Sequence, residues 1–166
     1  GRLQNQKNFY GLIKAFKIVL KKLPKKKMII IGSGHEEEKL KKLAKELKIV
    51  KQIKFIKYQN PEQKILNSKI LVLNSLWEGL PNILLEAQML KTPIISTNCE
   101  SGPNEILSNG KLGYLTPVNN EKKLALKIID VFNNYGDAKK KAQIALKYLN
   151  RFELNSQCQK YESFLK

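Results

Sequence analysis

The sequence contains little of what most metal and redox sites require. It has one histidine, His35, and two cysteines, Cys99 and Cys158. A catalytic zinc site or a Ser-His-Asp triad needs a histidine with suitable partners, and no such pattern surrounds His35. Two cysteines without metal-ligand spacing indicate reduced thiols rather than a disulfide. We therefore predict a cytoplasmic protein without a metal or disulfide framework.

Aspartate and arginine are also scarce. The only aspartates are Asp130 and Asp137, so an Asp-x-Asp pattern that would hold a cation beside a diphosphate is absent. The only arginines are Arg2 and Arg151, although the formal net charge is +17. Nucleic-acid recognition favours the bidentate guanidinium over lysine. The basic balance therefore indicates solvated lysine faces and disfavours a nucleic-acid partner, and peripheral association with an anionic membrane stays open.

Long hydrophobic runs are missing as well, and none approaches the length of a membrane span. With 166 residues and 42% hydrophobic content, the chain has the size of one domain with one core. No internal repeat or low-complexity linker divides it. We therefore predict a single domain over residues 1–166.

Short apolar runs alternate with amphipathic segments along the chain. The predicted strands are 28–31, 53–56, 70–73, 93–97 and 112–115. The predicted helices are 8–23, a helix opening at 36, 61–67, 82–90, 103–108, 121–135, 138–150 and 153–165. This order indicates an α/β fold with a Rossmann-like parallel sheet and helices on both faces. Residues 1–3 are the expected end of a further strand in a longer protein.

A helix start near the middle of the chain predicts a site for an anion. Pro81 fits there because its φ is preset and its missing N–H would be unpaired anyway. The following N–H groups, which lack a helical acceptor, are those of Asn82, Ile83 and Leu84. Together with the positive end of the helix dipole, they favour a phosphate.

Two glutamates lie close to this helix start. Glu78 is in the loop after strand 70–73, and Glu86 is inside the helix that follows. Carboxylates only accept hydrogen bonds, so beside an anion they need hydroxyl donors, which sugars supply in pairs. The alternative is that Glu78 is a surface loop residue and Glu86 a solvated helix residue.

The segment 75–87 closely resembles the signature of the glycosyl transferases group 1 family, which are retaining, nucleotide-sugar-dependent enzymes with the two-domain GT-B fold. In that family two glutamates stand eight positions apart, as Glu78 and Glu86 do. Further ordered matches are Gly1-Arg2-Leu3, Gly32-Ser33-Gly34, Gly102-Pro103-Asn104-Glu105-Ile106 and Gly110-Lys111-Leu112-Gly113. The resemblance implies the carboxy-terminal half of a GT-B fold, with the amino-terminal acceptor domain absent from this chain.

The resemblance assigns roles residue by residue. Arg2 and Lys7 would hold the diphosphate and neutralise the charge that grows on the leaving group. Glu78 would accept hydrogen bonds from the transferred sugar, and Glu86 from the ribose hydroxyls. Sugar and phosphate would also lie against the backbone of Gly79, Leu80, Pro81, Asn82, Ile83 and Leu84.

The nucleobase would lie against two loops that follow strands, one containing Gly32 and Gly34 and the other Lys57 and Tyr58. The family usually has glycine where this chain has Lys57, and glycine allows a closer approach of the backbone. The pair of glycines alone is a weak signal. Because the third glycine of a dinucleotide fingerprint would fall at Glu37, a hydride-transfer enzyme is disfavoured.

We therefore expect the donor-binding domain of a retaining glycosyltransferase that transfers a hexose or N-acetylhexosamine from a UDP- or GDP-linked donor, without a cofactor. The expected acceptor is a glycan or lipid-linked sugar of bacterial polysaccharide or lipopolysaccharide synthesis, bound through the amino-terminal domain. The isolated domain is not expected to turn over substrate. A GT-B nucleotide-sugar epimerase and a nonenzymatic nucleotide-sugar-binding module remain alternatives.

Overall fold

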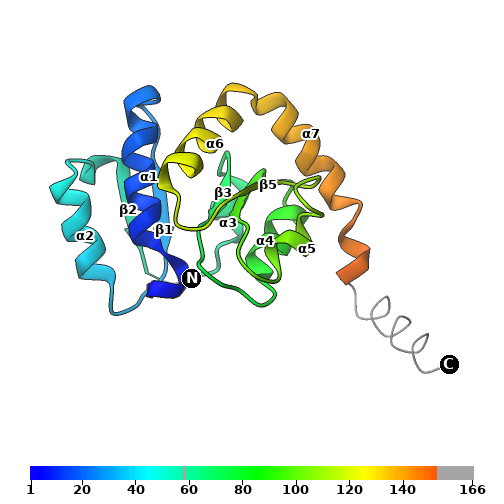
Figure 1. Cartoon of the computed structure of the whole chain (residues 1–166), viewed down its shortest axis with the longest axis horizontal. Helices are drawn as coiled ribbons and strands as arrows, with labels where there is room; N and C mark the ends of the chain where they lie inside the picture. Colours follow the sequence, from blue (N-terminus) through cyan, green and yellow to red (C-terminus); the bar gives the residue numbers. More distant parts are fainter. Residues whose placement is uncertain (58, 153–166) are drawn as a thin grey trace.

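The computed structural model describes residues 1–57 and 59–152, and its elements alternate as the sequence predicts (Figure 1). The strands are β1 (Met28–Ile31), β2 (Ile53–Ile56), β3 (Leu71–Leu73), β4 (Ile94–Thr97) and β5 (Tyr114–Thr116). The α-helices are α1 (Phe9–Lys22), α2 (Glu37–Glu46), α3 (Glu62–Leu66), α4 (Asn82–Met89), α5 (Pro103–Ile106), α6 (Glu121–Asn133) and α7 (Tyr135–Leu146). Short 3-10 helices are η1 (Asn5–Lys7), η2 (Val50–Gln52) and η3 (Leu149–Phe152). The helix predicted over 153–165 lies outside the described residues.

The described parallel strands form two sheets. β1 pairs with β2, and β3, β4 and β5 pair in that order. Within the described residues no strand bridges β1 and β3, so the sheet is interrupted between them. The predicted parallel pairing and the α/β class are confirmed, with the described strands divided between two sheets.

Two predicted boundaries are wrong. The last strand starts at Tyr114, because the Leu112 N–H donates to the Leu107 carbonyl at 3.0 Å and closes the turn after α5. The helix predicted from residue 138 starts at Tyr135, directly after Asn134, which ends α6. Such shifts are typical of boundaries, where turn hydrogen bonds compete with the repeating pattern.

The capping of α1 follows from the local sequence. Asn8 adopts a left-handed φ of 45°, and its side-chain oxygen accepts a hydrogen bond from the Gly11 N–H at 3.0 Å. The helix ends at Lys22, and Pro24 follows shortly after, where a proline cannot continue the helix. One face of α1 packs against α6.

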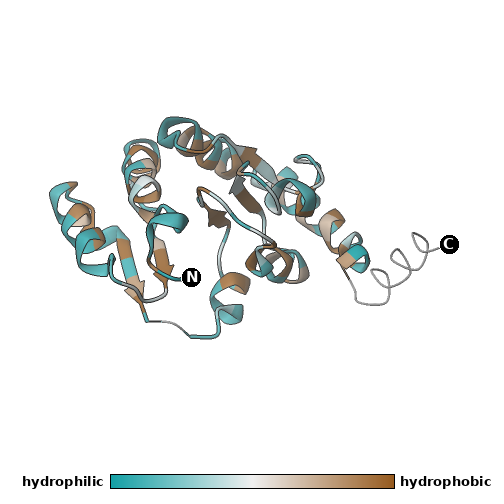
Figure 2. Cartoon of the chain, turned by 60° about the horizontal axis from the view of Figure 1, so that its bottom comes forward, coloured by the Kyte–Doolittle hydropathy of each residue, from teal (hydrophilic) through white to brown (hydrophobic). Residues whose placement is uncertain are grey.

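Helices cover both faces of the strands, as Figure 2 shows by the hydrophobic colour of the strands and the hydrophilic outer sides of the helices. β4 illustrates the alternation. Ile94 packs with α3, α4 and α5, whereas Ile95 packs in the cluster that contains α1 and α6. Loops at the carboxyl ends of the strands are therefore left to form a site.

Candidate functional site

An ion pair joins η1 to the loop after β3. Lys7 Nζ lies 2.6 Å from Glu78 Oε1, and the two side chains are 20% and 6% exposed. The Ser75 hydroxyl donates to the same oxygen at 2.5 Å. Charge-assisted hydrogen bonds of this length are strong, and low exposure limits screening by salt. The carboxylate is thus held at the carboxyl end of β3.

Buried polar groups keep the Glu78 loop in place. The Thr97 hydroxyl donates to the Ser75 carbonyl at 2.6 Å, and the Asn74 amide donates to the Asn8 carbonyl at 2.9 Å. Gln6 both accepts from and donates to the backbone of this loop. Sequence reasoning did not assign these residues. Their signal is the change from apolar to polar residues at the carboxyl ends of β3 and β4.

Gly32 and Gly34 let residues 1–3 pass directly over the end of β1. A Cβ on Gly32, which has a φ of 155°, would overlap the backbone of Gly1. A Cβ on Gly34 would lie 2.8 Å from the Leu3 nitrogen. The two glycines therefore hold Arg2 at the edge of the site, and their predicted contact with a nucleobase stays a prediction.

The charges of Lys7 and Glu86 both act on the amino group of Gly1. Burial lowers the pKa of this amino group, the positive charge of Lys7 lowers it further, and the negative charge of Glu86 raises it. Such field effects act mainly between neighbouring charges. The structure therefore brings Glu86, an exposed residue of α4, to the same end of the molecule as the Lys7–Glu78 pair.

The start of α4 lies in this region. One of the three N–H groups that the sequence predicted to be unpaired has an acceptor. Pro81 precedes the helix with a φ of −75°, and Asn82 is the first helical residue. The Leu84 N–H donates to the Pro81 carbonyl at 2.9 Å, so the prediction that this N–H is unpaired is wrong. The first turn tightens and satisfies it. Across residues 1–57 and 59–152, nothing accepts from the N–H groups of Asn82 and Ile83.

The loop before α4 packs on the start of α5. Gly102 has a φ of 58°, and a Cβ there would lie 2.6 Å from Pro81 Cδ and overlap the Gly79 carbonyl. A Cβ on Gly79 would meet open space, and Leu80 is 52% exposed. Gly102 therefore packs against the backbone of Gly79 and the ring of Pro81. The side of the loop at Leu80 stays accessible.

A thiol that sequence reasoning did not place in the site lies beside Glu78. Burial raises the pKa of the Cys99 thiol most, and the charge of Glu78 raises it further, against a lowering hydrogen bond with Thr97. A raised pKa keeps the thiol protonated at neutral pH and therefore poorly nucleophilic. Cys99 is thus a buried, uncharged residue close to Glu78.

The remaining predicted residues lie near the end of β2 or outside the site. Lys57 is exposed directly after β2, whose last residue, Ile56, accepts from the Gly32 N–H at 2.9 Å. Tyr58 lies outside the described residues. His35 is exposed before α2. In the part of the chain that the structure describes, no three His, Cys, Asp or Glu side chains gather as for a metal ion. The expected independence from metals stays a prediction.

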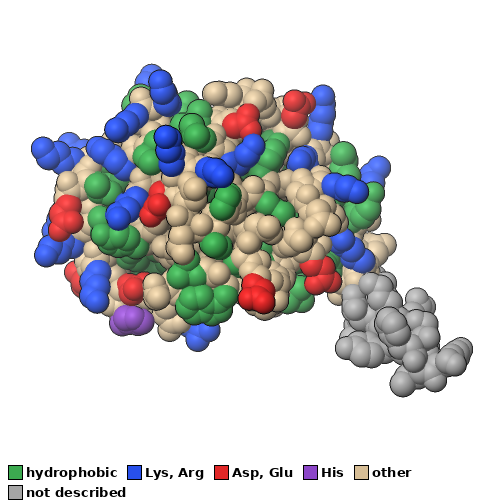
Figure 3. Space-filling view, in the orientation of Figure 1, with side chains coloured by type: hydrophobic (Ala, Val, Ile, Leu, Met, Phe, Trp, Pro, Cys, Tyr) green, Lys and Arg blue, Asp and Glu red, His purple; other side chains and the backbone are tan. Residues whose placement is uncertain are grey.

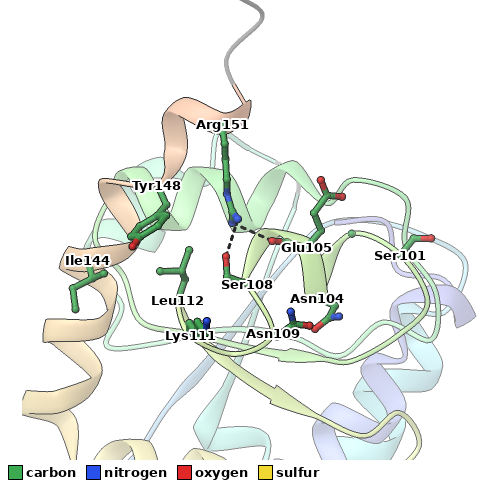
Figure 4. Close-up of a pocket in the computed structure, with 11 residues that line it drawn as sticks. Ser101, Asn104, Glu105, Ser108, Asn109, Lys111, Leu112, Ile144, Tyr148 and Arg151 are labelled. Atoms are coloured by element: carbon green, nitrogen blue, oxygen red, sulfur yellow. Dashed lines mark hydrogen bonds between the residues drawn. The ribbon is translucent and has the colours of Figure 1, made fainter. Parts of the chain in front are cut away.

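A hollow of about 730 Å³ lies between α5 and α7, with Gly102 in its wall (Figure 4). Arg151 points into it and donates to the Ser108 hydroxyl at 2.7 Å and to the Ile106 carbonyl at 2.6 Å. Its wall includes Tyr148 and Lys111, and also Gly102, Asn104 and Glu105 of the turn at the start of α5. Glu78, Glu86, Arg2 and Lys7 do not line it.

On the face that Figure 3 shows, the basic residues do not gather in one place. Figure 3 shows Lys and Arg side chains spread over the visible face among acidic and apolar ones. Of the described helices, none has the length and apolar character needed to cross a bilayer. On this face the lysines are therefore dispersed as on an ordinary solvated surface.

Comparison with protein families shows which family the chain belongs to. The model of the family described as glycosyl transferases group 1 matches residues 1–148. The chain belongs to this family. It is 44% identical over 108 residues to an uncharacterized glycosyltransferase of Methanocaldococcus jannaschii, covering 64% of the chain and 27% of the relative.

A second relative carries the name of a specific transfer reaction. The chain is 27% identical over 152 residues to the poly(glycerol-phosphate) alpha-glucosyltransferase of Bacillus subtilis, covering 91% of the chain and 23% of the relative. The chain thus spans about a quarter of the length of these two relatives.

The fold agrees with this membership. The crystal structure of a TarM mutant of S. aureus in complex with fondaparinux, alpha-GlcNAc-glycerol and UDP matches with a TM-score of 0.90 and 25% identity. The match covers 98% of this chain and 34% of that one. This confirms the expected Rossmann-like half of a GT-B fold.

The buried hydroxyl of Ser75 gives a first testable prediction. Ser75→Ala removes one donor to Glu78 Oε1, so the free energy of unfolding should fall by about 1–2 kcal/mol in urea titrations. Ser33→Ala is the matched control, because Ser33 is exposed. A Ser75→Ala variant as stable as the control would show that the hydroxyl does not hold the carboxylate.

Proposed function

We propose that this chain is the nucleotide-sugar-binding part of a retaining glycosyltransferase that builds a bacterial surface glycan. The observation that carries the proposal is the Lys7–Glu78 pair beside the start of α4, with Glu86 on the same helix. This arrangement combines cations and free N–H groups for a diphosphate with carboxylates for sugar hydroxyls.

The diphosphate would bind between residues 2–7 and the start of α4. Arg2 is exposed, and its guanidinium has no partner among the described residues. The N–H groups of Asn82 and Ile83 are free in the same sense. Together with Lys7, these groups would stabilise the negative charge that develops on the leaving nucleoside diphosphate.

The two glutamates would bind the sugar and the ribose. Lys7 and Ser75 both donate to Oε1 of Glu78, which leaves Oε2 without a partner in the described part of the chain. That oxygen is available to a hydroxyl of the transferred sugar. Glu86 is exposed and equally free, which suits the ribose hydroxyls. A hydrogen bond to a charged group contributes about 1.5–3 kcal/mol.

The acceptor would bind outside these residues, on the rest of a longer enzyme. The poly(glycerol-phosphate) alpha-glucosyltransferase supports a glycosidic transfer to a surface polymer or a lipid-linked glycan. The donor would be a UDP- or GDP-linked hexose or N-acetylhexosamine, and the UDP in the TarM complex supports the first of these. The reaction would take place in the cytoplasm or on the inner face of the membrane.

Calorimetry with nucleoside diphosphates tests the proposal. We expect UDP or GDP to bind to this chain with and without a chelator, because the diphosphate contacts come from Arg2, Lys7 and backbone N–H groups. Inorganic sulfate at equal ionic strength is the control for unspecific anion binding. Absence of any nucleotide binding, or strict dependence on magnesium, would contradict the proposed site.

A further inference from the structure

The hollow between α5 and α7 has a wall that basic side chains of the chain hold in place. Arg151, in η3, donates to the Ser108 hydroxyl at 2.7 Å and to two carbonyls at the end of α5. Lys141, in α7, donates to the Gly110 carbonyl at 2.9 Å, in the turn that follows α5. These bonds tie α5 and its turn to α7 and η3. The wall is therefore preorganised, which lowers the cost of binding a ligand.

The charges that this wall offers to a ligand nearly cancel. Both Nη atoms of Arg151 donate to the protein itself, so the guanidinium serves the wall. The other charged residues of the lining are Lys111 and Glu105. Both are exposed, and neither side chain has a partner among residues 1–57 and 59–152. One positive and one negative charge favour a neutral ligand over a phosphate, which would be repelled by the carboxylate.

Three uncharged polar side chains line the same hollow. They are Ser101, Asn104 and Asn109. In the part of the chain that the structure describes, none of these side chains makes a hydrogen bond. An asparagine amide donates and accepts at the same time, as neighbouring hydroxyls of a sugar do. The polar part of the wall therefore suits a polyhydroxylated ligand.

An apolar side faces these polar groups. Figure 4 shows Ile144 and Tyr148 on the side of α7 and Ser101 and Asn104 on the opposite side. Ile144 and Tyr148 are 49% and 52% exposed, which is high for large apolar side chains. A pyranose ring has an apolar face of C–H groups, and these pack well on the electron-rich face of an aromatic ring. Tyr148 is therefore suited to contact the face of a sugar.

We propose that this hollow binds a neutral saccharide, with Tyr148 against a sugar ring and with Asn104 and Asn109 bonded to its hydroxyls. The volume of about 730 Å³ is that of a small-molecule site. Gly102 lines the hollow and also packs against the loop before α4, so the saccharide site adjoins the proposed donor site. Saccharide binding does not rest on the proposed function. Its role does: the hollow would hold a part of the glycan away from its reacting end.

Two-dimensional NMR of the chain during a saccharide titration tests the proposal. The probes are maltotriose and N,N'-diacetylchitobiose, which represent neutral hexose and N-acetylhexosamine chains. We expect the amide signals of Asn104, Asn109 and Tyr148 to shift with at least one of them, with a dissociation constant on the order of 1 mM. Sulfated maltotriose, the charged control, should bind more weakly.

Variants of the wall show which side chains act on the saccharide. Tyr148→Ala should weaken binding by roughly fivefold to tenfold, and Asn104→Leu by roughly threefold to tenfold. Tyr10→Ala is the matched control, because Tyr10 is 50% exposed on α1 and does not line the hollow. Binding of UDP or GDP in calorimetry should be the same in all three variants as in the parent chain.

Absence of shifts at the hollow with both neutral saccharides would overturn the proposal, even if UDP or GDP binds. Tighter binding of sulfated maltotriose would also overturn it, because the hollow would then be an anion site. So would equal saccharide affinity in Tyr148→Ala and Tyr10→Ala. Saccharide binding without any nucleotide binding would support this site and contradict only the proposed function.

Discussion

Lys7→Met should remove much of the affinity for a nucleotide sugar and destabilise the chain at the same time. The substitution deletes a diphosphate ligand and leaves the Glu78 carboxylate, 6% exposed, without its cation. Loss of a charged hydrogen bond to the diphosphate should weaken binding by roughly tenfold to a hundredfold in calorimetry. Leaving a partly buried charge unpaired should lower the free energy of unfolding by about 2 kcal/mol or more.

A double-mutant cycle separates the two consequences of this change. In Lys7→Met/Glu78→Gln the unpaired charge is gone, so much of the lost stability should return while nucleotide binding stays weak. Lys22→Met, an exposed lysine at the end of α1, is the matched control and should change neither quantity. If Lys7→Met left both stability and binding as in the control, Lys7 would be an ordinary surface lysine.

Glu86→Gln and Glu78→Gln should affect different parts of the donor. Glu86→Gln should weaken binding of the nucleoside diphosphate by roughly tenfold to a hundredfold, because a charged acceptor for the ribose is lost. Glu78→Gln should leave this binding nearly intact but weaken recognition of the intact nucleotide sugar. Calorimetry with the diphosphate and with its sugar measures both.

The exposure of each glutamate side chain decides what the controls for Glu86→Gln and Glu78→Gln should show. Glu86 is exposed, so Glu86→Gln should leave the free energy of unfolding unchanged, whereas Glu78→Gln should lower it because the ion pair with Lys7 is lost. Glu62→Gln in α3, also exposed, should be silent in every measurement. Equal losses of diphosphate binding in Glu78→Gln and Glu86→Gln would contradict the proposed division of roles.

The order of helices and strands could be predicted from the sequence, because local signals determine it. Apolar runs such as 28–31 and 53–56 favour strands buried on both faces, and Pro24 and Pro81 mark helix ends. The two glutamates could be found because a helix start lies between them. The ion pair between Lys7 and Glu78, at 2.6 Å, was not predicted and appears only in the structure.

Two kinds of feature could not be predicted: contacts between segments far apart in the chain, and turn hydrogen bonds that compete with the helical or strand pattern. The sequence indicated that Gly32 and Gly34 lie in a turn, but their packing against residues 1–3 appears only in the folded chain. The Leu84 N–H was expected to be free, and a tighter first turn satisfies it. Boundary errors at Tyr114 and Tyr135 have the same cause, since turn hydrogen bonds there outweigh the apolar period.

By itself the sequence determined the α/β class, the strand order along the chain and the loop that carries Glu78, since all three follow from patterns within about ten neighbouring residues. Tertiary structure alone decided that the Ser75 hydroxyl donates to the Glu78 carboxylate, that Thr97 donates to the Ser75 carbonyl and that Cys99 lies near Glu78. It also decided that the sheet is interrupted between β1 and β3. Pairing of strands and burial of polar groups are set by segments far apart in the chain, and no local pattern reports them.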